Sequence, residues 1–202
     1  MASLDTADRA AMEAFAHATG SPLNNADTLD WSVVAAWGLK LRDIRDSLGC
    51  HLDDGQLRSE IERFLCSHNT CALATAGDAG VRATPIEYVY AQGCLYFLSE
   101  GGVKFANLLS NPHVSVCVFE PYHTMADVGG LQLTGTARLV DPQDAAADRV
   151  LDAQHLTRGK PGQLPFDLNI IEVRLERAEL LLSALGKRRV DSRQIYDFTR
   201  ST

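Results

Sequence analysis

The chain has 202 residues, of which 46% are hydrophobic and 22% are charged, and its formal net charge is −7. This composition indicates a soluble globular protein with one sizeable core, and an acidic chain lacks the basic stripe of a nucleic-acid-binding surface. No segment is apolar over the length of a membrane-spanning helix, so we expect no membrane partner. Five cysteines, without a secretory signal at the N-terminus, indicate reduced thiols and a cytoplasmic protein.

The first segment, residues 1–56, is predicted to be a helical N-terminal extension that differs from the rest of the chain. The alanine-rich residues 5–18 predict a first helix, and an apolar stripe over residues 31–44 predicts a second. Asp53 or Asp54 can cap a third helix. The apolar face of this third helix consists of Leu57, Ile61, Phe64 and Leu65. Both tryptophans of the chain lie in the extension, and we interpret them as packing residues.

Strand-like runs follow the extension, and turn-forming residues separate them. The expected strands are residues 70–76, 81–90, 95–98, 113–120, 131–140 and 166–182, the last as one strand or a pair. Residues 77–80 join the first two strands in a tight turn. A helix is expected from residue 141 to about residue 155, before a polar loop at 157–165. Mostly antiparallel strands with short helices predict a closed barrel, which removes exposed sheet edges.

The most informative segment is residues 99–112, which read Ser-Glu-Gly-Gly-Val-Lys-Phe-Ala-Asn-Leu-Leu-Ser-Asn-Pro. Two glycines end the preceding strand, and the apolar residues after them have the spacing of a short helix, which Asn111-Pro112 stops. Lys104 lies in the first turn of this helix. The N-terminus of a helix favours an anion and the lysine adds a full positive charge, so the turn can hold a phosphate. A solvated lysine on a surface helix is the alternative that these residues alone leave open.

The block from residue 64 to residue 142 carries several short motifs in a fixed order. They are Leu73-Ala74-Thr75 with the Gly80 turn, Arg82-Ala83-Thr84-Pro85, Leu95-Tyr96-Phe97-Leu98-Ser99, Lys104-Phe105-Ala106-Asn107-Leu108, Asn111-Pro112-His113-Val114-Ser115 and Gln132-Leu133-Thr134-Gly135-Thr136-Ala137. Their order and spacing resemble the flavin-binding split-barrel family typified by pyridoxamine 5'-phosphate oxidase, over residues 57–183.

The resemblance implies a mainly β (α+β) protein, an FMN-binding split β-barrel with short peripheral helices and, here, a helical N-terminal extension. We therefore expect three parts: the extension at 1–56, a split-barrel flavin-binding domain at 57–185, and a C-terminal tail at 186–202. In this family FMN lies at the interface between two subunits, so the resemblance also implies a homodimer.

The resemblance assigns the cofactor contacts to particular positions. Arg82 and Lys104 match the basic residues that bind the FMN phosphate, and Ser99 matches a hydroxyl donor. The family lays the flavin ring along the second strand, here Ala83, Thr84 and Pro85, which contact it through their backbone. A polar residue on the strand after the long loop also contacts the cofactor, and Gln132 matches it by position. From the residues alone, Arg82 as a surface strand residue and Gln132 as a solvent-facing glutamine remain alternatives.

The expected function is that of an FMN-dependent oxidoreductase that transfers hydride or electrons to a small substrate, which the sequence does not identify. A non-catalytic flavin-binding or electron-carrying module is the alternative, and a haem-binding or deazaflavin-binding split barrel is a further one. The family's substrate-binding C-terminal stretch is replaced here by residues 188–193, Arg-Arg-Val-Asp-Ser-Arg, so we expect no oxidation of vitamin B6 phosphates. No histidine follows His155, whereas haem-degrading members depend on a C-terminal histidine.

No other constellation in the sequence carries a recognisable chemistry. Cys66, His68 and Cys71 are close in sequence, but three ligands without a fourth make a poor zinc site, so we expect no metal. We interpret Cys71 as a small core residue and His68 as a polar group at a helix end. No nucleophile, paired carboxylates or catalytic acid or base can be named from the sequence.

Overall fold

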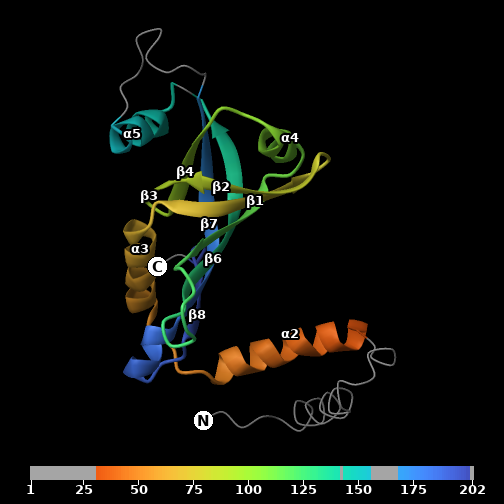
Figure 1. The fold of residues 1–202 in the computed structure, drawn as a ribbon, viewed down its shortest axis with the longest axis vertical. Helices are drawn as coiled ribbons and strands as arrows, with labels where there is room; N and C mark the ends of the chain where they lie inside the picture. Colours follow the sequence, from red (N-terminus) through yellow and green to blue (C-terminus); the bar gives the residue numbers. More distant parts are fainter. Residues whose placement is uncertain (1–30, 142, 156–167, 201–202) are drawn as a thin grey trace. The chain divides into compact units, whose positions relative to one another are not determined.

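The computed structural model describes residues 31–141, 143–155 and 168–200. The chain forms two compact units, residues 1–51 and 52–202, which are described separately. In the first unit, helix α2 spans Trp31–Leu48 and ends just before Gly49 (Figure 1). The predicted helix over 5–18 and the predicted loop over 157–165 lie outside the described residues, as do the tryptophan side chains. Among the described helices, none is both long and apolar enough to cross a membrane.

Helix α3, Asp54–Ser67, opens the second unit and begins at one of the two predicted caps. The Asp53 carboxylate accepts a hydrogen bond of 2.8 Å from the backbone N–H of Gln56, which satisfies one of the free donors of the first turn. The four apolar residues predicted to face inward are all buried. They recur at three- and four-residue spacing, so they lie on the side of the helix that packs against the sheet.

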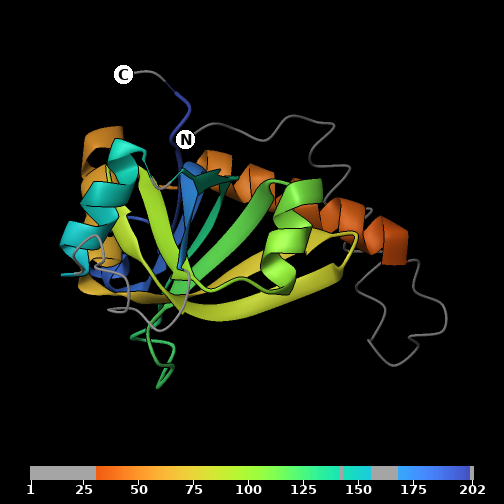
Figure 2. The ribbon, with the colours of Figure 1, turned by 90° about the horizontal axis from the view of Figure 1, so that it is seen from above.

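The second unit is built on one antiparallel eight-stranded sheet with the order β2-β1-β5-β6-β7-β4-β3, and β8 pairs with β7 (Figures 1 and 2). The strands are β1 Thr70–Gly77, β2 Gly80–Glu87, β3 Val89–Ala91, β4 Cys94–Ser99, β5 His113–Phe119, β6 Gly129–Val140, β7 Asn169–Leu182 and β8 Arg193–Asp197. Two short helices accompany them, α4 Val103–Ser110 and α5 Ala145–Ala153. This architecture confirms the predicted fold class, a split barrel with short peripheral helices.

One face of the curved sheet carries the main core, together with α3 and α4. Its fully buried side chains include Ile61, Leu65, Leu73, Leu95, Phe97, Val116, Leu131, Leu133, Ile171 and Leu180. The alternation of buried and exposed residues along β1, β5 and β6 has the period of two expected for strands with one buried face. A smaller cluster packs α5 against the ends of β4, β6 and β7.

The long strands β6 and β7 pair along their length, and the register of this pairing shifts between Thr134 and Gly135. Thr134 pairs with Arg177 and Gly135 pairs with Leu175, so β7 contains one extra residue, Glu176, at this point. Such a bulge bends the strand and increases its twist. A Cβ atom on Gly135 would lie 2.2 Å from the Arg174 carbonyl oxygen, so the two backbones approach here more closely than any side chain allows.

The structure extends the second unit beyond the predicted domain at both ends. The unit begins at Leu52 rather than at residue 57, and it includes residues 186–200, which were expected to form a separate tail. A 3₁₀ helix spans Ser183–Arg188, and β8 pairs along β7. Gln194 is fully buried and its Oε1 accepts a 3.1 Å hydrogen bond from the Leu52 backbone. The sequence of β8 hides this role because charged residues begin and end a strand of only five residues.

Two predicted elements also differ in their boundaries. The run predicted as one strand over 81–90 is two strands, β2 and β3, because Tyr88 between them turns inward. Its side chain is 3% exposed and its hydroxyl donates a 2.9 Å hydrogen bond to the Leu65 carbonyl. Helix α5 begins at Ala145 rather than near residue 141, because Asp144 is the residue that caps it. The predicted last strand is a single strand, β7.

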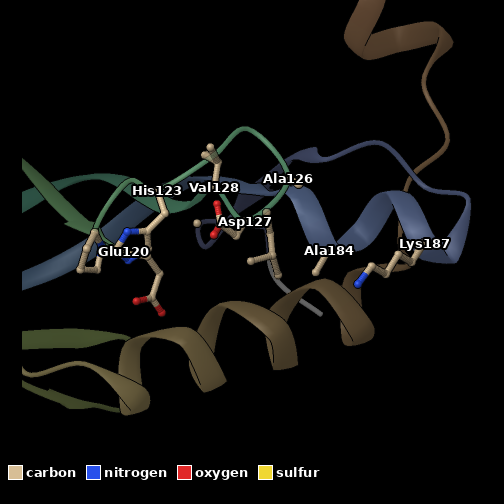
Figure 3. Close-up of a pocket in the computed structure, with 10 residues that line it drawn as sticks. Glu120, His123, Ala126, Asp127, Val128, Ala184 and Lys187 are labelled. Carbon is tan, nitrogen blue, oxygen red and sulfur yellow. The ribbon is translucent and has the colours of Figure 1, made fainter.

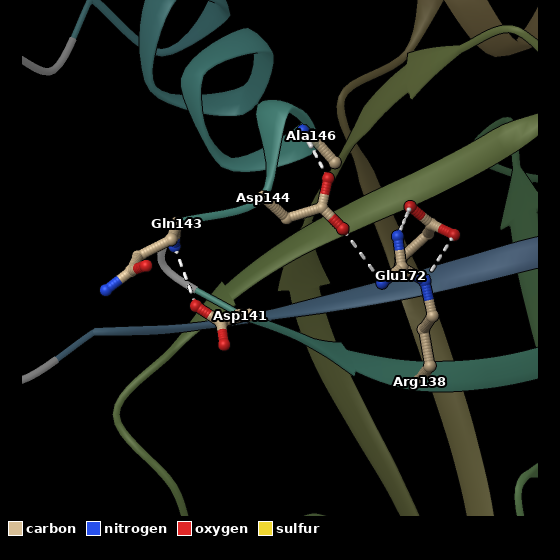
Figure 4. Close-up of polar contacts among 6 residues, drawn as sticks. All are labelled: Arg138, Asp141, Gln143, Asp144, Ala146 and Glu172. Carbon is tan, nitrogen blue, oxygen red and sulfur yellow. Dashed lines mark hydrogen bonds and ion pairs between the residues drawn. The ribbon is translucent and has the colours of Figure 1, made fainter.

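A cluster of charges fastens the start of α5 to the sheet (Figure 4). The Arg138 guanidinium on β6 donates two hydrogen bonds, of 2.9 and 2.8 Å, to the Glu172 carboxylate on β7. A third, of 3.1 Å, reaches Asp144, whose other oxygen accepts from the Ala146 backbone. Glu172 is 5% exposed, and its pKa lies below the usual value of 4.5, first because of these hydrogen bonds from Arg138.

This cluster makes stability depend on pH on the acidic side. A carboxyl whose pKa is lowered by folding contributes stability above its unfolded pKa, and this contribution is lost as pH falls through the lowered folded pKa. We expect Arg138→Met to cost about 1–2 kcal/mol of unfolding free energy at pH 7, since half of the Arg138 side chain is solvent-exposed. The variant should also lose less stability than the parent as pH falls below 4.5. Urea unfolding at pH 7 and at about pH 3.5 measures both.

The matched control is Arg177→Met, which removes the same charge from an exposed ion pair with Glu179 on the same sheet. Surface pairs contribute little, so this variant should unfold close to the parent at both pH values. Equal losses in the two variants would show that the Arg138 cluster contributes no more than an ordinary surface pair.

The second unit should fold without the first. Among the described residues, the buried side chains of the main core all lie at or after Leu52, so we expect the core to be complete within residues 52–202. We expect a chain that lacks residues 1–51 to keep a single cooperative thermal transition, followed by circular dichroism. Loss of cooperative unfolding would show that the N-terminal extension belongs to the barrel core.

Candidate cofactor-binding site

The turn between β4 and α4 has the backbone geometry of an anion-binding site. Gly101 and Gly102 adopt φ angles of 135° and 96°, in the region that only glycine enters readily. Gly102 is the N-cap of α4 and has no side chain that could accept a hydrogen bond. Within the described residues, the first N–H groups of this helix therefore lack a side-chain cap. Ser99, which is 6% exposed, accepts a 3.3 Å hydrogen bond from Gly101 N through its hydroxyl. The turn thus presents backbone donors beside a serine hydroxyl.

Lys104 folds back over this turn from the first turn of α4. Its Nζ donates a 2.7 Å hydrogen bond to the Gly101 carbonyl and lies 5.7 Å from the centroid of the Phe105 ring. The pKa of Lys104 is lowered from its usual 10.5, first by partial burial and then by the positive charge of Arg82, while Glu100 acts in the opposite direction. Arg82 and Lys104, predicted as two phosphate ligands, are therefore close enough for their charges to repel each other.

The register of the β1–β2 hairpin explains why Arg82 reaches α4. Arg82 stands opposite Thr75, and Thr84 stands opposite Leu73. Residues directly opposite in an antiparallel pair share one face of the sheet. Thr75 and Leu73 are buried on the core side, so Arg82 and Thr84 belong to the face on which α4 packs (Figure 2).

Asn107 holds α4 against this hairpin and was not identified from the sequence. It is fully buried, and its Nδ2 donates hydrogen bonds to Thr75 Oγ1 at 3.2 Å and to the Gly80 carbonyl at 2.7 Å. The packing is tight, because a Cβ atom on Gly77 would lie 2.8 Å from the Asn107 Cα. A signal for this role exists in the sequence: asparagine is unfavourable within a helix, so one on the apolar face of a short helix indicates a specific polar contact.

The Oδ1 atom of Asn107 has no hydrogen-bond partner among the described residues, although it is buried. A buried acceptor without a donor costs free energy, so this position favours an added N–H or O–H group. The side chain lies three residues after Lys104 on the same helix and bridges the two strands of the hairpin that carries Arg82. The orphaned acceptor thus belongs to the helix that carries Lys104, at its contact with the hairpin that carries Arg82.

Not all predicted cofactor residues direct their side chains towards this turn. Ala83 and Pro85 stand opposite Ala74 and Ala72, so they face away from Arg82, Lys104 and Ser99. Gln132 is exposed on this outward face of the sheet, opposite Cys117 and Glu179. Around Gln132, many outward side chains of four neighbouring strands are small or uncharged: Ala72, Ala74, Val81, Ala83, Pro85, Ser115, Cys117 and Thr134. Glu87 and Arg138, on the same face, are charged.

This outward face is hollowed at one point. A depression of about 300 Å³ is lined by residues of β1, β2, β5, β6 and β7, among them Ala74, Val81, His113 and Glu176. Val81 is 85% exposed at its edge. A broad sheet face of small side chains, with an exposed valine at its rim, has the character of a protein interface rather than of a solvated surface.

A larger cavity lies elsewhere and is chemically less suited to a cofactor (Figure 3). It measures about 420 Å³ and is lined by the loop after β5 and by the 3₁₀ helix, including Glu120, His123, Asp127 and Lys187. Two of its carboxylates already have partners: Glu120 pairs with His68 at 3.1 Å, and Asp127 accepts hydrogen bonds from Thr124. Its lining within the described residues includes no predicted cofactor ligand.

The remaining candidates from the sequence have structural roles. Cys71 is buried, and its pKa is raised to about 12 by burial, so its thiol is unreactive. His68 is the C-cap of α3, and its Nδ1 lies 2.8 Å from the Phe64 carbonyl. In the part of the chain that the structure describes, no three histidine, cysteine or acidic side chains are grouped to hold a metal ion.

Comparison with known proteins identifies the same region of the chain. The sequence profile of the pyridoxamine 5'-phosphate oxidase family matches residues 57–182. The sequence matches no curated protein.

Several solved structures share the fold at low sequence identity. Campylobacter jejuni ChuZ is 16% identical with a TM-score of 0.53, over 80% of this chain and 65% of that one. A conserved hypothetical protein of Mycobacterium tuberculosis is 20% identical with a TM-score of 0.52, over 69% and 91%. A Listeria innocua protein provisionally assigned as a pyridoxamine 5'-phosphate oxidase is 20% identical with a TM-score of 0.50, over 62% and 98%. At these identities the likeness shows the fold alone.

Proposed function

Because the chain belongs to the pyridoxamine 5'-phosphate oxidase family, we propose that it is a flavoprotein that binds FMN and transfers hydride or electrons through it to a small substrate. Family membership supports flavin binding. The observation that carries the assignment in this chain is the convergence of Arg82 and Lys104 at the glycine turn before α4.

The residues at this turn fit a phosphate group. Two cations from different elements repel each other there, and an anion between them would relieve both the repulsion and the cost of partial burial. The free N–H groups at the start of α4 and the Ser99 hydroxyl would supply hydrogen bonds to phosphate oxygens. Lys104 would exchange its hydrogen bond with the Gly101 carbonyl for one with the phosphate.

The outward face of the sheet supports a homodimer with the cofactor at the subunit interface. The Gln132 side chain lies on the face of the sheet opposite the phosphate-binding turn, which favours a contact with the cofactor of a second copy. Ala83 and Pro85 are expected to contact the ring through their backbone, whichever way their side chains face. In the proposed dimer, the backbone of β2 lies along the flavin ring and Gln132 reaches the cofactor of the second copy. The small side chains of this face would let the two sheets approach closely.

When bound, FMN supplies hydride or single-electron transfer at its ring system, and the protein positions the ring and excludes water. The described residues around the turn include no carboxylate or imidazole that we assign as a proton donor or acceptor for a substrate. Vitamin B6 phosphates remain unexpected as substrates. Two arginines of the segment 188–193 are already paired within the chain, Arg188 with Glu60 at 2.6 Å and Arg193 with Glu179 at 2.7 Å.

The absorbance spectrum of the purified protein tests the proposal. We expect flavin bands that bleach when NADH or NADPH is added without oxygen, and a dimer by light scattering. Flavin bands without bleaching by any reductant would favour a non-catalytic flavin module. A Soret band after haem addition, without flavin binding, would overturn the flavin assignment in favour of haem.

A further inference from the structure

The buried amide of Asn107 acts only as a donor toward the β1–β2 hairpin. The Gly80 carbonyl oxygen can only accept a hydrogen bond, so the Asn107 atom 2.7 Å from it is the amide nitrogen, Nδ2. The second hydrogen of Nδ2 is donated to Thr75 Oγ1 at 3.2 Å. Both donors are therefore used, and Oδ1 is the atom without a partner among the described residues.

These two hydrogen bonds reach the hairpin at the position of Arg82. Thr75 stands directly opposite Arg82 in the pairing of β1 with β2. Gly80 lies two residues before Arg82, at the start of β2. On the helix side, Asn107 follows Lys104 by three residues, which is about one turn of α4. The amide of Asn107 thus connects the helix that carries one proposed phosphate ligand to the cross-strand partner of the other.

The contact is close enough to fix the position of α4. A Cβ atom on Gly77 would lie 2.8 Å from Asn107 Cα and 2.9 Å from its carbonyl oxygen, so the helix lies directly on the hairpin backbone. Ser110 Oγ accepts a 3.2 Å hydrogen bond from Asp78 N and donates one of 3.1 Å to the Asn107 carbonyl. Because α4 has only eight residues, fixing its second half also fixes the turn that carries Lys104.

We propose that Asn107 is a positioning residue for phosphate binding, which holds Lys104 and the first N–H groups of α4 where they can bind the same phosphate as Arg82. The inference rests on the proposed function, since it concerns the same phosphate-binding turn. In this role Asn107 acts through the position of α4 and makes no contact with the ligand. Charge-assisted hydrogen bonds weaken when their distance and angle depart from the optimum, so a displaced helix binds phosphate less tightly.

The substitution Asn107→Leu tests this role because it removes both donors without adding a charge and keeps a side chain of similar length. The variant also loses the unpartnered acceptor, which offsets part of the lost hydrogen bonds, so we expect it to fold. FMN should bind about tenfold more weakly, since Lys104 stays but is no longer held in place. Riboflavin, which has no phosphate, should bind as it does to the parent. Flavin fluorescence titration with both ligands measures the ratio of the two affinities.

The matched control is Asn111→Leu at the C-cap of the same helix. Asn111 Oδ1 accepts a 3.0 Å hydrogen bond from His113 N, so this variant also loses a side-chain hydrogen bond but keeps the contacts of Asn107 with the hairpin. It should keep the parent's ratio of FMN to riboflavin affinity. Equal weakening of FMN and riboflavin in Asn107→Leu, or unchanged binding of both, would overturn the proposal.

A second variant decides if Asn107→Leu does not fold. Thr75→Val keeps the shape of the side chain and removes the acceptor of one of the two hydrogen bonds from Asn107. We expect about a two- to fivefold loss of FMN affinity with riboflavin unchanged, as for the loss of one neutral hydrogen bond. An FMN affinity equal to that of the parent would refute the role of Asn107.

Thermal stabilisation by inorganic phosphate separates this proposal from the proposed function. If the parent binds neither FMN nor riboflavin, the flavin assignment fails, but an anion that binds the turn still stabilises the folded protein. We expect phosphate to raise the unfolding temperature of the parent and of Asn111→Leu by the same amount, and that of Asn107→Leu by less. No stabilisation of the parent, or equal stabilisation of all three proteins, would overturn the positioning role.

Discussion

Replacing Gly135 with alanine should destabilise the barrel by about 3 kcal/mol, near the upper end of what overpacking costs. The added Cβ would lie 2.2 Å from the Arg174 carbonyl oxygen and 3.0 Å from Val173 Cγ1. The first of these atoms belongs to the backbone of β7, so a change of rotamer cannot relieve the clash. Relief requires β6 and β7, the two longest strands of the sheet, to separate at the bulge. The hydrogen bonds between these two strands hold the centre of the sheet together there.

Gly130→Ala is a matched control on the same strand. Its Cβ would meet the nearest atoms, Val118 O and Phe119 Cβ, at 3.8 and 3.9 Å, which are ordinary contacts. We expect this variant to unfold within about 1 kcal/mol of the parent. Urea unfolding of the three proteins gives the comparison. Similar midpoints for both variants would mean that the bulge yields easily and that Gly135 is not required for the pairing of β6 and β7.

Replacing Lys104 with alanine should weaken FMN binding about ten- to a hundredfold and leave riboflavin binding nearly unchanged. The lysine is assigned to the phosphate and not to the ring, and a charge-assisted hydrogen bond of this kind contributes about 1.5–3 kcal/mol. Arg82→Ala should act in the same direction, because the two cations converge on one turn. Both effects should decrease as the salt concentration rises.

Fluorescence titration of the variants with FMN and riboflavin measures the effect. Lys187→Ala, which removes the same charge on the 3₁₀ helix after β7, is the control and should bind both ligands as the parent does. Equal weakening of FMN and riboflavin in Lys104→Ala would remove this residue from the phosphate site. That result would also take away the main support for the flavin assignment in this chain.

The same lysine makes FMN binding depend on pH on the alkaline side. The phosphate binds the protonated amine of Lys104. The pKa of Lys104 is lowered in the free protein, so FMN binding should raise it. FMN affinity should therefore be constant below the pKa of Lys104 in the free protein and fall as pH rises through it. Because that pKa lies below the usual 10.5, the fall should begin at lower pH than for an ordinary lysine. Lys104→Ala should abolish this part of the pH dependence.

The sequence by itself determined the elements whose signals lie within a few residues of one another. The cap and apolar stripe of α3, the tight turn between β1 and β2, and the glycine break before α4 were all predicted and are all present. Helix caps, turn glycines and periodic apolar faces act through the neighbouring backbone, so a short window of sequence carries the whole signal. The ordered motifs between Leu73 and Ala137 also identified the family.

Only the tertiary structure decided which of these elements meet, and on which face. The β1–β2 register places Arg82 on the side of Lys104 and leaves Ala83 and Pro85 on the other, and a shift of one residue would exchange them. Other roles likewise depend on partners far along the chain. Asn107 bonds to Gly80, 27 residues away, and Gly135 lies against Arg174, 39 residues away. Strand β8 pairs with β7 through residues such as Tyr196 and Ala178, which are 18 residues apart. Such contacts are set by packing and strand register across the whole sheet, and no local sequence pattern encodes them.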